Sequence, residues 1–195
     1  MSDIIHNTII AANHLYFCPV GTSPLIDRNH KPGDDKWVPV GIVDDVGPNN
    51  DEEKVKITAP KNFVNQTVRE VSHTLEMKYD VSLKSVDNFV MAAIYKCDFG
   101  SLKDANGNII FTPGSKASHE GWFKWMMVDP DDGVGNNKIN GDVILQILDV
   151  FGSYSVDGYN PKNTEGATPT LHITQLYTDK NKGLFNRQGI LISTL

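Results

Sequence analysis

Alternation of apolar and polar residues dominates one long stretch of the chain, VREVSHTLEMKYDVSLK, residues 68–84. From Val71 to Leu83 the odd positions are apolar or aromatic apart from His73, and the even positions are polar. A period of two predicts a half-buried β-strand, because successive strand side chains point to opposite faces. Such a strand would be far longer than the usual five or six residues, so a bend or bulge within it is expected.

The period changes at Ser85. Residues 85–97, SVDNFVMAAIYKC, place apolar side chains at the i, i+3, i+4, i+7 and i+8 spacing of a helix that packs on one face. That face holds Val86, Phe89, Val90, Ala93, Ile94 and Cys97. Ser85 is a suitable N-cap, and Gly100 is a suitable end. This is the one strong helix that the pattern predicts.

Shorter apolar runs predict the remaining strands. They lie at 9–20, 37–46, 55–63, 121–129, 142–152 and 168–178, with a final strand or arm from residue 184. Turn-forming residues separate them, including a turn at 47–54, and Asn106-Gly107 predicts a hairpin. Strands joined by tight turns predict antiparallel pairing. We therefore expect a mainly β protein, an antiparallel β-sandwich or barrel with one flanking α-helix at about 85–97 and extended loops or arms, in a single domain over 1–195.

Composition and charge narrow the functional classes. The chain holds 18 basic and 24 acidic residues, a net charge of −6, which argues against tight binding of a nucleic-acid backbone. It suits a surface that lets nucleic acid pass without sticking. No run approaches about 18 apolar residues, so no membrane insertion is expected. The start lacks a basic, then apolar, signal sequence, and synthesis in the cytoplasm is expected.

Candidate chemistry is sparse, and no catalytic, cofactor-binding or metal-ligating residue is predicted. Cys18 and Cys97 form no CxxC pair, and the six histidines form no HxxxH, HExxH or HxH motif. His73 and His172 are interpreted as core or interface histidines, on the apolar phase of their strands. The pairs Asp44-Asp45 and Asp131-Asp132 adjoin turns, which favours solvated loop charge. No enzyme is predicted.

An aromatic group at Trp122, Phe123 and Trp125 could stack on bases or sugars. Trp122 and Trp125 differ by three positions and therefore lie on opposite faces of a regular strand. One of the two indoles is expected to point into the core.

The order of elements resembles that of a known family. HLYFCPVGT is followed by WVPVGIVDDV, and then by the long alternating strand that runs straight into SVDNFVMAAIYK. This layout, over roughly residues 9–97, resembles the major tail tube proteins of long-tailed, siphovirus-like bacteriophages, which are related in fold to the type VI secretion tube protein. The later strands agree in kind and carry no diagnostic motif.

The resemblance implies a structural virion protein located in the tail. Six subunits would form a ring, rings would stack into a tube, and DNA would pass through the lumen without specific binding. Partners would be copies of the protein itself and other tail proteins such as the tape measure, terminator and distal tail proteins. Loops 21–36 and 98–121 would contact the adjacent ring. The odd face of 71–83 would pack on the core, and the even face, with Glu76, Lys78 and Asp80, would meet the channel or a neighbouring sheet.

Two other classes stay open. One is another tail or virion component, such as a terminator or a decoration protein. The other is a carbohydrate-binding β-sandwich module that uses Trp122 or Trp125. Self-assembly into tubes, single rings or no assembly would separate these classes.

Overall fold

The protein is mainly β, as the alternation predicts. The computed structural model describes residues 12–22, 24–61, 64–85, 88–97, 105–106, 112–114, 119–129, 138–139, 142–160 and 168–185. The strands are β1 Ala12–Pro19, β2 Gly21–Thr22, β3 Leu25–Ile26, β4 Val38–Pro39, β5 Val43–Lys61, β6 Val64–Leu83, β7 Glu120–Asp129, β8 Lys138–Ile139, β9 Asp142–Asp157, β10 Thr170–Gln175 and β11 Lys182–Phe185. The helices are α1, Asn88–Ile94, and a short 3-10 turn, Asp34–Lys36. One flanking helix on an antiparallel β protein is therefore confirmed.

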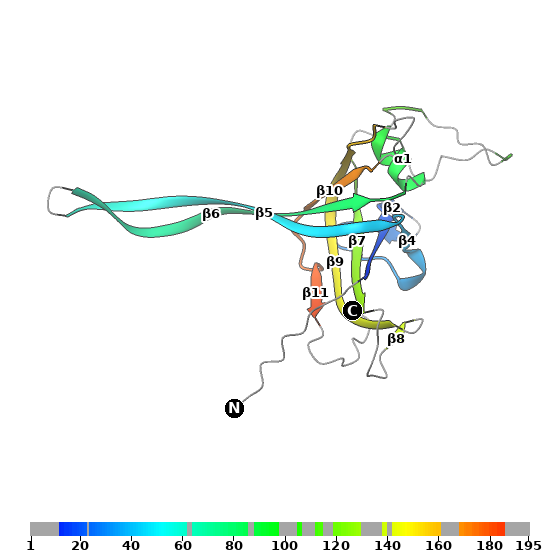
Figure 1. Ribbon diagram of the computed structural model, residues 1–195, viewed down its shortest axis with the longest axis horizontal. Helices are drawn as coiled ribbons and strands as arrows, with labels where there is room; N and C mark the ends of the chain where they lie inside the picture. Colours follow the sequence, from blue (N-terminus) through cyan, green and yellow to red (C-terminus); the bar gives the residue numbers. More distant parts are fainter. Residues whose placement is uncertain are drawn as a thin grey trace.

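The main sheet is antiparallel and curls until its two ends meet. Its order is β4-β1-β7-β9-β10-β6-β5, with β8 and β11 also paired to β9 (Figure 1). The outermost strands of this order, β4 and β5, are joined by residues 40–42 alone. The Val40 N–H donates to Leu15 O on β1 at 2.9 Å, and the Lys84 N–H donates to Ile42 O at 2.8 Å. The hydrogen-bonded ladder does not close, and the 40–42 link spans the gap.

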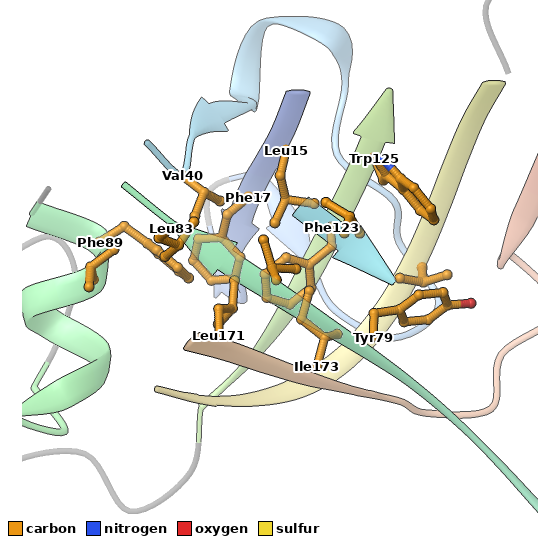
Figure 2. Close-up of a cluster of buried hydrophobic side chains, with 14 residues drawn as sticks. Leu15, Phe17, Val40, Tyr79, Leu83, Phe89, Phe123, Trp125, Leu171 and Ile173 are labelled. Atoms are coloured by element: carbon orange, nitrogen blue, oxygen red, sulfur yellow. The ribbon is translucent and has the colours of Figure 1, made fainter. Parts of the chain in front are cut away.

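The core lies inside this curl, where β1, β6, β7 and β10 each contribute alternate residues (Figure 2). Phe17 is at its centre, because its ring centroid lies 4.6 Å from that of Phe89 and 5.0 Å from those of Phe123 and Tyr154. Helix α1 packs against β9 and supplies Phe89, so the lone helix completes the aromatic cluster. Clusters of this kind stabilise mainly through the apolar area that they remove from water.

The opposite face of β1, β7 and β9 is covered as well. Cys18, Trp122 and Phe151 pack there with Ile26 from β3, under a layer that includes Trp37. Trp122 and Trp125 do lie on opposite faces, because they belong to different buried clusters. Trp125 points into the core as expected, and Trp122 is buried as well, because the loop after β1 folds back over the second face. 

The sequence pattern misplaced the boundaries of β5 and β9. The predicted turn at 47–54 is wrong, because GPNNDEEK lies inside β5 and pairs residue by residue with β6. The predicted 37–46 strand is split by the 40–42 link, and β9 continues to Asp157 rather than ending at 152. Polar and turn-forming residues are tolerated in these strands because a long neighbour supplies their backbone hydrogen bonds.

Helix α1 is shorter than the predicted 85–97. It ends at Ile94, Lys96 adopts a left-handed φ of 50°, and the Cys97 N–H donates to Ala92 O at 3.0 Å. This is the hydrogen bond of a helix end at which glycine is usually found. The Ser85 hydroxyl accepts the Ile42 N–H at 2.8 Å, so it holds the strand link. The buried stripe of Phe89, Val90, Ala93 and Cys97 is confirmed.

Two predictions lie outside the described residues. Of the Asn106-Gly107 hairpin, only residues 105–106 are described, and they form a turn. Of the final strand or arm from residue 184, only its first part is described, as the end of β11.

Gly121 of β7 lies where a side chain would collide with β1. A Cβ built at this position would lie 2.4 Å from the Phe17 ring and 2.6 Å from Cys18 O. We expect Gly121→Ala to lower the free energy of unfolding by about 2–3 kcal/mol, because the central ring of the core would have to move. Gly47→Ala is the matched control, since nothing lies within 4 Å of its added methyl. Urea denaturation measures both variants, and equal midpoints would contradict the packing assigned to Phe17.

Candidate assembly surface

The paired strands β5 and β6 continue far beyond the body of the protein (Figure 1). β10 pairs with β6 only between Lys78 and Ser82, and β5 pairs with β6 alone among the described strands. We call residues 50–61 and 64–77 the arm. Twelve residues of β5 make the arm about 40 Å long at about 3.3 Å per residue. Over this length the ribbon is only two strands wide.

The arm offers two strand edges that no third described strand covers. Such edges present a row of backbone donors and acceptors to which another chain can add a strand. A two-stranded ribbon is also marginally stable in water without further packing. These two properties make the arm the strongest candidate for an assembly surface.

Bulges and prolines limit which strands the arm can accept. The register shifts where Glu53 and Lys54 face Thr74 and Ser72, so that His73 is an extra residue, and it shifts again between Ile57 and Thr58. Bulges increase the local twist. Pro48 and Pro60 of β5 lack an N–H to donate, as is usual for an edge strand. The bulge expected within the long strand is thus confirmed, and His73 lies on the arm rather than in the core of the body.

The two faces of β6 separate at the base of the arm as the alternation predicts. Tyr79, Val81 and Leu83 are buried in the core, whereas Glu76 and Ser82 are exposed. The side chains of 68–75 lie outside the described residues. Whether the even face meets a channel or a neighbouring sheet stays a prediction.

His172 connects three strands at the base of the arm. Its Nδ1 lies 2.6 Å from Asp80 Oδ1 on β6, and its Nε2 lies 3.0 Å from Asp157 Oδ2 on β9. The Asn49 amide on β5 donates to the other Asp80 oxygen at 2.9 Å. A polar chain therefore crosses four strands from β5 to β9. We call these four side chains the clamp.

The interpretation of His172 as a residue on the apolar phase is wrong. Leu171 and Ile173 are the buried residues of β10, and the His172 side chain lies on the other face with 38% of its surface exposed. The signal was present in the sequence, because Leu171 and Ile173 share one parity and His172 has the other.

The clamp favours a charged imidazole. Both ring nitrogens face carboxylate oxygens, and only the imidazolium form donates from both. Burial lowers the pKa of His172, but the hydrogen bonds to Asp80 and Asp157 outweigh burial and raise it above its ordinary value. The hydrogen bond from His172, and then that from Asn49, lower the pKa of Asp80.

The loop at 21–36 is held against its own subunit. Lys31 forms an ion pair with Asp149, whose side chain is fully buried on β9. Lys124 of β7 lies 4.7 Å from the Trp37 ring centroid and 3.6 Å from Asp34. Residues 28–30 and 33–36 remain exposed. Contact of this loop with another ring therefore stays a prediction for its exposed part, and most of the loop at 98–121 lies outside the described residues.

The other residues singled out in the sequence do not converge on a site. Within the described residues no three His, Cys, Asp or Glu side chains could together hold a metal ion. Cys18 and Cys97 are each buried, in separate clusters. Asp44 is exposed and pairs with Lys84 at 2.5 Å, and Asp131-Asp132 lies outside the described residues. No described helix is long and apolar enough to cross a membrane.

The clamp predicts a pH-dependent stability. The raised pKa of His172 means that its contribution is complete below its ordinary value of 6.5 and is lost as the pH rises through the raised pKa. The lowered pKa of Asp80 means that its contribution is present above 3.8 and is lost as the pH falls through the lowered pKa. The clamp therefore contributes most to the stability of the folded protein between pH 3.8 and pH 6.5.

We expect His172→Gln to lower the free energy of unfolding at pH 5.5 by up to about 1 kcal/mol, the range of solvent-screened ion pairs. The difference from the wild type should shrink at pH 8.5. Thermal denaturation at the two pH values measures it, and His14→Gln, at an exposed position of β1, controls for the loss of an imidazole. An equal difference at both pH values would contradict the clamp.

We expect loss of the Lys31–Asp149 ion pair to lower the free energy of unfolding more than loss of the clamp does. Lys31→Met would leave the Asp149 carboxylate buried without its cation, and we expect a loss of about 3 kcal/mol in unfolding free energy. Lys36→Met, which breaks an exposed pair with Asp35, should change it by less than about 0.5 kcal/mol. Chemical denaturation compares the two variants. The double variant Lys31→Met/Asp149→Leu should recover much of the loss. Equal stability of Lys31→Met and Lys36→Met, together with no recovery in the double variant, would exclude a stabilising ion pair.

Comparison with known proteins assigns this chain to no family. No protein-family model matches the sequence, and no curated protein matches it either.

Proposed function

We propose that this protein is a structural subunit that assembles with copies of itself into stacked, hexameric rings, forming a tube of the kind found in bacteriophage tails. The arm is the observation that carries the proposal. It is a ribbon about 40 Å long and two strands wide that projects from the body.

Ordering the arm costs free energy that strands added by a neighbouring copy would help to offset. Ordering each residue of a chain costs about 1–2 kcal/mol of backbone entropy, and burial in a core normally offsets that cost. No third described strand pairs with the arm, so its two strand edges are open. A neighbouring copy that adds strands to the arm would supply further backbone hydrogen bonds, and a closed ring would leave few strand edges exposed.

The charge at the base of the arm supports the proposal of a tube through which DNA moves. On the even face Lys78 pairs with Glu76 at 3.0 Å, and Asp80 pairs with His172. A face on which positive charges are already paired would not hold a polyanion tightly. In this function the protein has no catalytic role, it resides in the virion tail, and DNA passes through the tube without specific binding. Its other partners are the tape measure, terminator and distal tail proteins.

The carbohydrate-binding alternative loses its main support. Trp122 is fully buried and donates to Asp27 O at 2.8 Å, and Trp125 is 8% exposed and donates to Asn13 Oδ1 at 3.0 Å. Neither indole offers a face on which a sugar could stack. 

Removal of the arm tests the proposal. Residues 51–76 are replaced by Asn-Gly, so that Asn50 and Met77, which are paired in the ribbon, are joined by a two-residue hairpin turn. We expect the full chain to form tubes in negative-stain electron microscopy. The shortened protein should remain monomeric, because it lacks the added-strand surface.

The controls separate folding from assembly. The shortened protein should keep a cooperative thermal transition, because every residue of the main core cluster is retained. Tubes formed by the shortened protein, or a full chain that stays monomeric at high concentration, would overturn the proposal. Single rings that do not stack would favour a terminator-like component instead.

A further inference from the structure

Charge is unevenly distributed along the arm. Its inner part, residues 50–53 and 73–77, contains four acidic residues and no lysine or arginine: Asp51, Glu52, Glu53 and Glu76. Its outer part, residues 54–61 and 64–72, contains Lys54, Lys56, Lys61 and Arg69 against the single acid Glu70, a net charge of +3. All other residues of the chain hold 14 basic and 23 acidic side chains, a net charge of −9. The ribbon thus carries a basic segment away from an acidic molecule.

The register concentrates the acidic charge. Asp51 is directly opposite Glu76, and like charges in opposed positions destabilise a ribbon. Glu52 and Glu76 are exposed, as is Lys56 in the outer part. Lys78, in the body next to the arm, lies 3.0 Å from Glu76. The inner part itself contains four acids and no lysine or arginine, so a basic neighbour would reduce its net negative charge.

We infer that the basic outer part of one arm docks on the acidic inner part of the arm of a second copy. This inference rests on the proposed function and adds the geometry of the contact. Two arms that point the same way, as in a stack of identical rings, would bring like parts together if they lay side by side in the same register. A displacement of about six residues, roughly 20 Å, would bring opposite charges together.

The displacement determines which kind of assembly the arms form. The contact uses different surfaces on the two copies, and a contact of this type continues from subunit to subunit unless a rotation closes it. Copies displaced by roughly 20 Å along the arm stand at different heights. The arm therefore connects one ring to the next, and it adds a second element to the loops expected to make ring-to-ring contacts.

A nucleic acid is a poorer partner for the basic outer part. Its phosphates repeat along the whole strand, so a backbone that follows the arm would meet the four inner acids as well as the basic residues. The arm of a second copy instead carries its acids in one segment, the inner part, which can lie opposite the basic outer part.

Charge reversal tests the contact. The outer variant is Lys54→Glu/Lys56→Glu/Arg69→Glu, and the inner variant is Asp51→Lys/Glu52→Lys/Glu53→Lys. We expect each variant alone to lower the rate of tube formation, followed by light scattering and electron microscopy, at least tenfold at 50 mM salt. One chain that carries both sets should recover assembly, because the complementarity is restored in the opposite sense. Lys96→Glu/Lys180→Glu/Lys182→Glu, at exposed positions away from the arm, makes the same charge change as the outer variant and should assemble like the wild type.

The outcomes distinguish the contact from the function on which it rests. A wild-type protein that stays monomeric overturns both. Wild-type tubes together with normal assembly of the outer and inner variants overturn the inference alone. Loss of assembly in both variants without recovery in the combined chain also overturns it. So does tight binding of a DNA oligonucleotide by the wild type that the outer variant loses while its tubes still form.

Discussion

The link at residues 40–42 is the constraint on which the rest of the structure depends. It joins the two ends of the sheet order, and its backbone bonds to β1 on one side and to the residue after β6 on the other. Val40 within it is completely buried. Because the link fixes where β5 begins beside β6, it sets the pairing at the base of the hairpin. The curl that it completes also encloses the space that Phe17 and Phe89 fill.

The molecule divides into a body with a packed core and an arm of two paired strands. The boundary lies at Lys78, where β10 stops pairing with β6. On the body side, alternate residues of β6 enter the core, and polar residues between them form the clamp. Beyond the boundary the same strand continues with only one partner. One uninterrupted strand therefore takes part in a core at one end and offers edges to another molecule at the other end.

Local periodicity predicted those parts of the fold that depend on neighbouring residues. The alternation from Tyr79 to Leu83, the buried stripe of α1 and the opposite faces of Trp122 and Trp125 all follow from the geometry of a single strand or helix. The sequence of β10 also shows that His172 lies on the face opposite to Leu171 and Ile173, so the expectation that it lies on the apolar face misread the alternation.

Other features depend on residues far away in the sequence. GPNNDEEK has the composition of a turn and is a strand only because β6 lies beside it. The burial of Trp122 requires the loop that contains Ile26. The clamp joins residues of four strands, from Asn49 to His172, at a distance that no spacing rule encodes. The extent of the arm, which is the candidate site, could not be read from either strand alone.

The direction of the arm has a mechanical consequence. Hydrogen bonds in an antiparallel ladder run perpendicular to the strands. A pull along the arm would load the bonds between β5 and β6, and those between β6 and β10, in shear, so that many must break together. A sideways pull on one strand would instead open them one at a time. A subunit joined to its neighbours through such a ribbon would resist stretching along the arm far better than peeling across it.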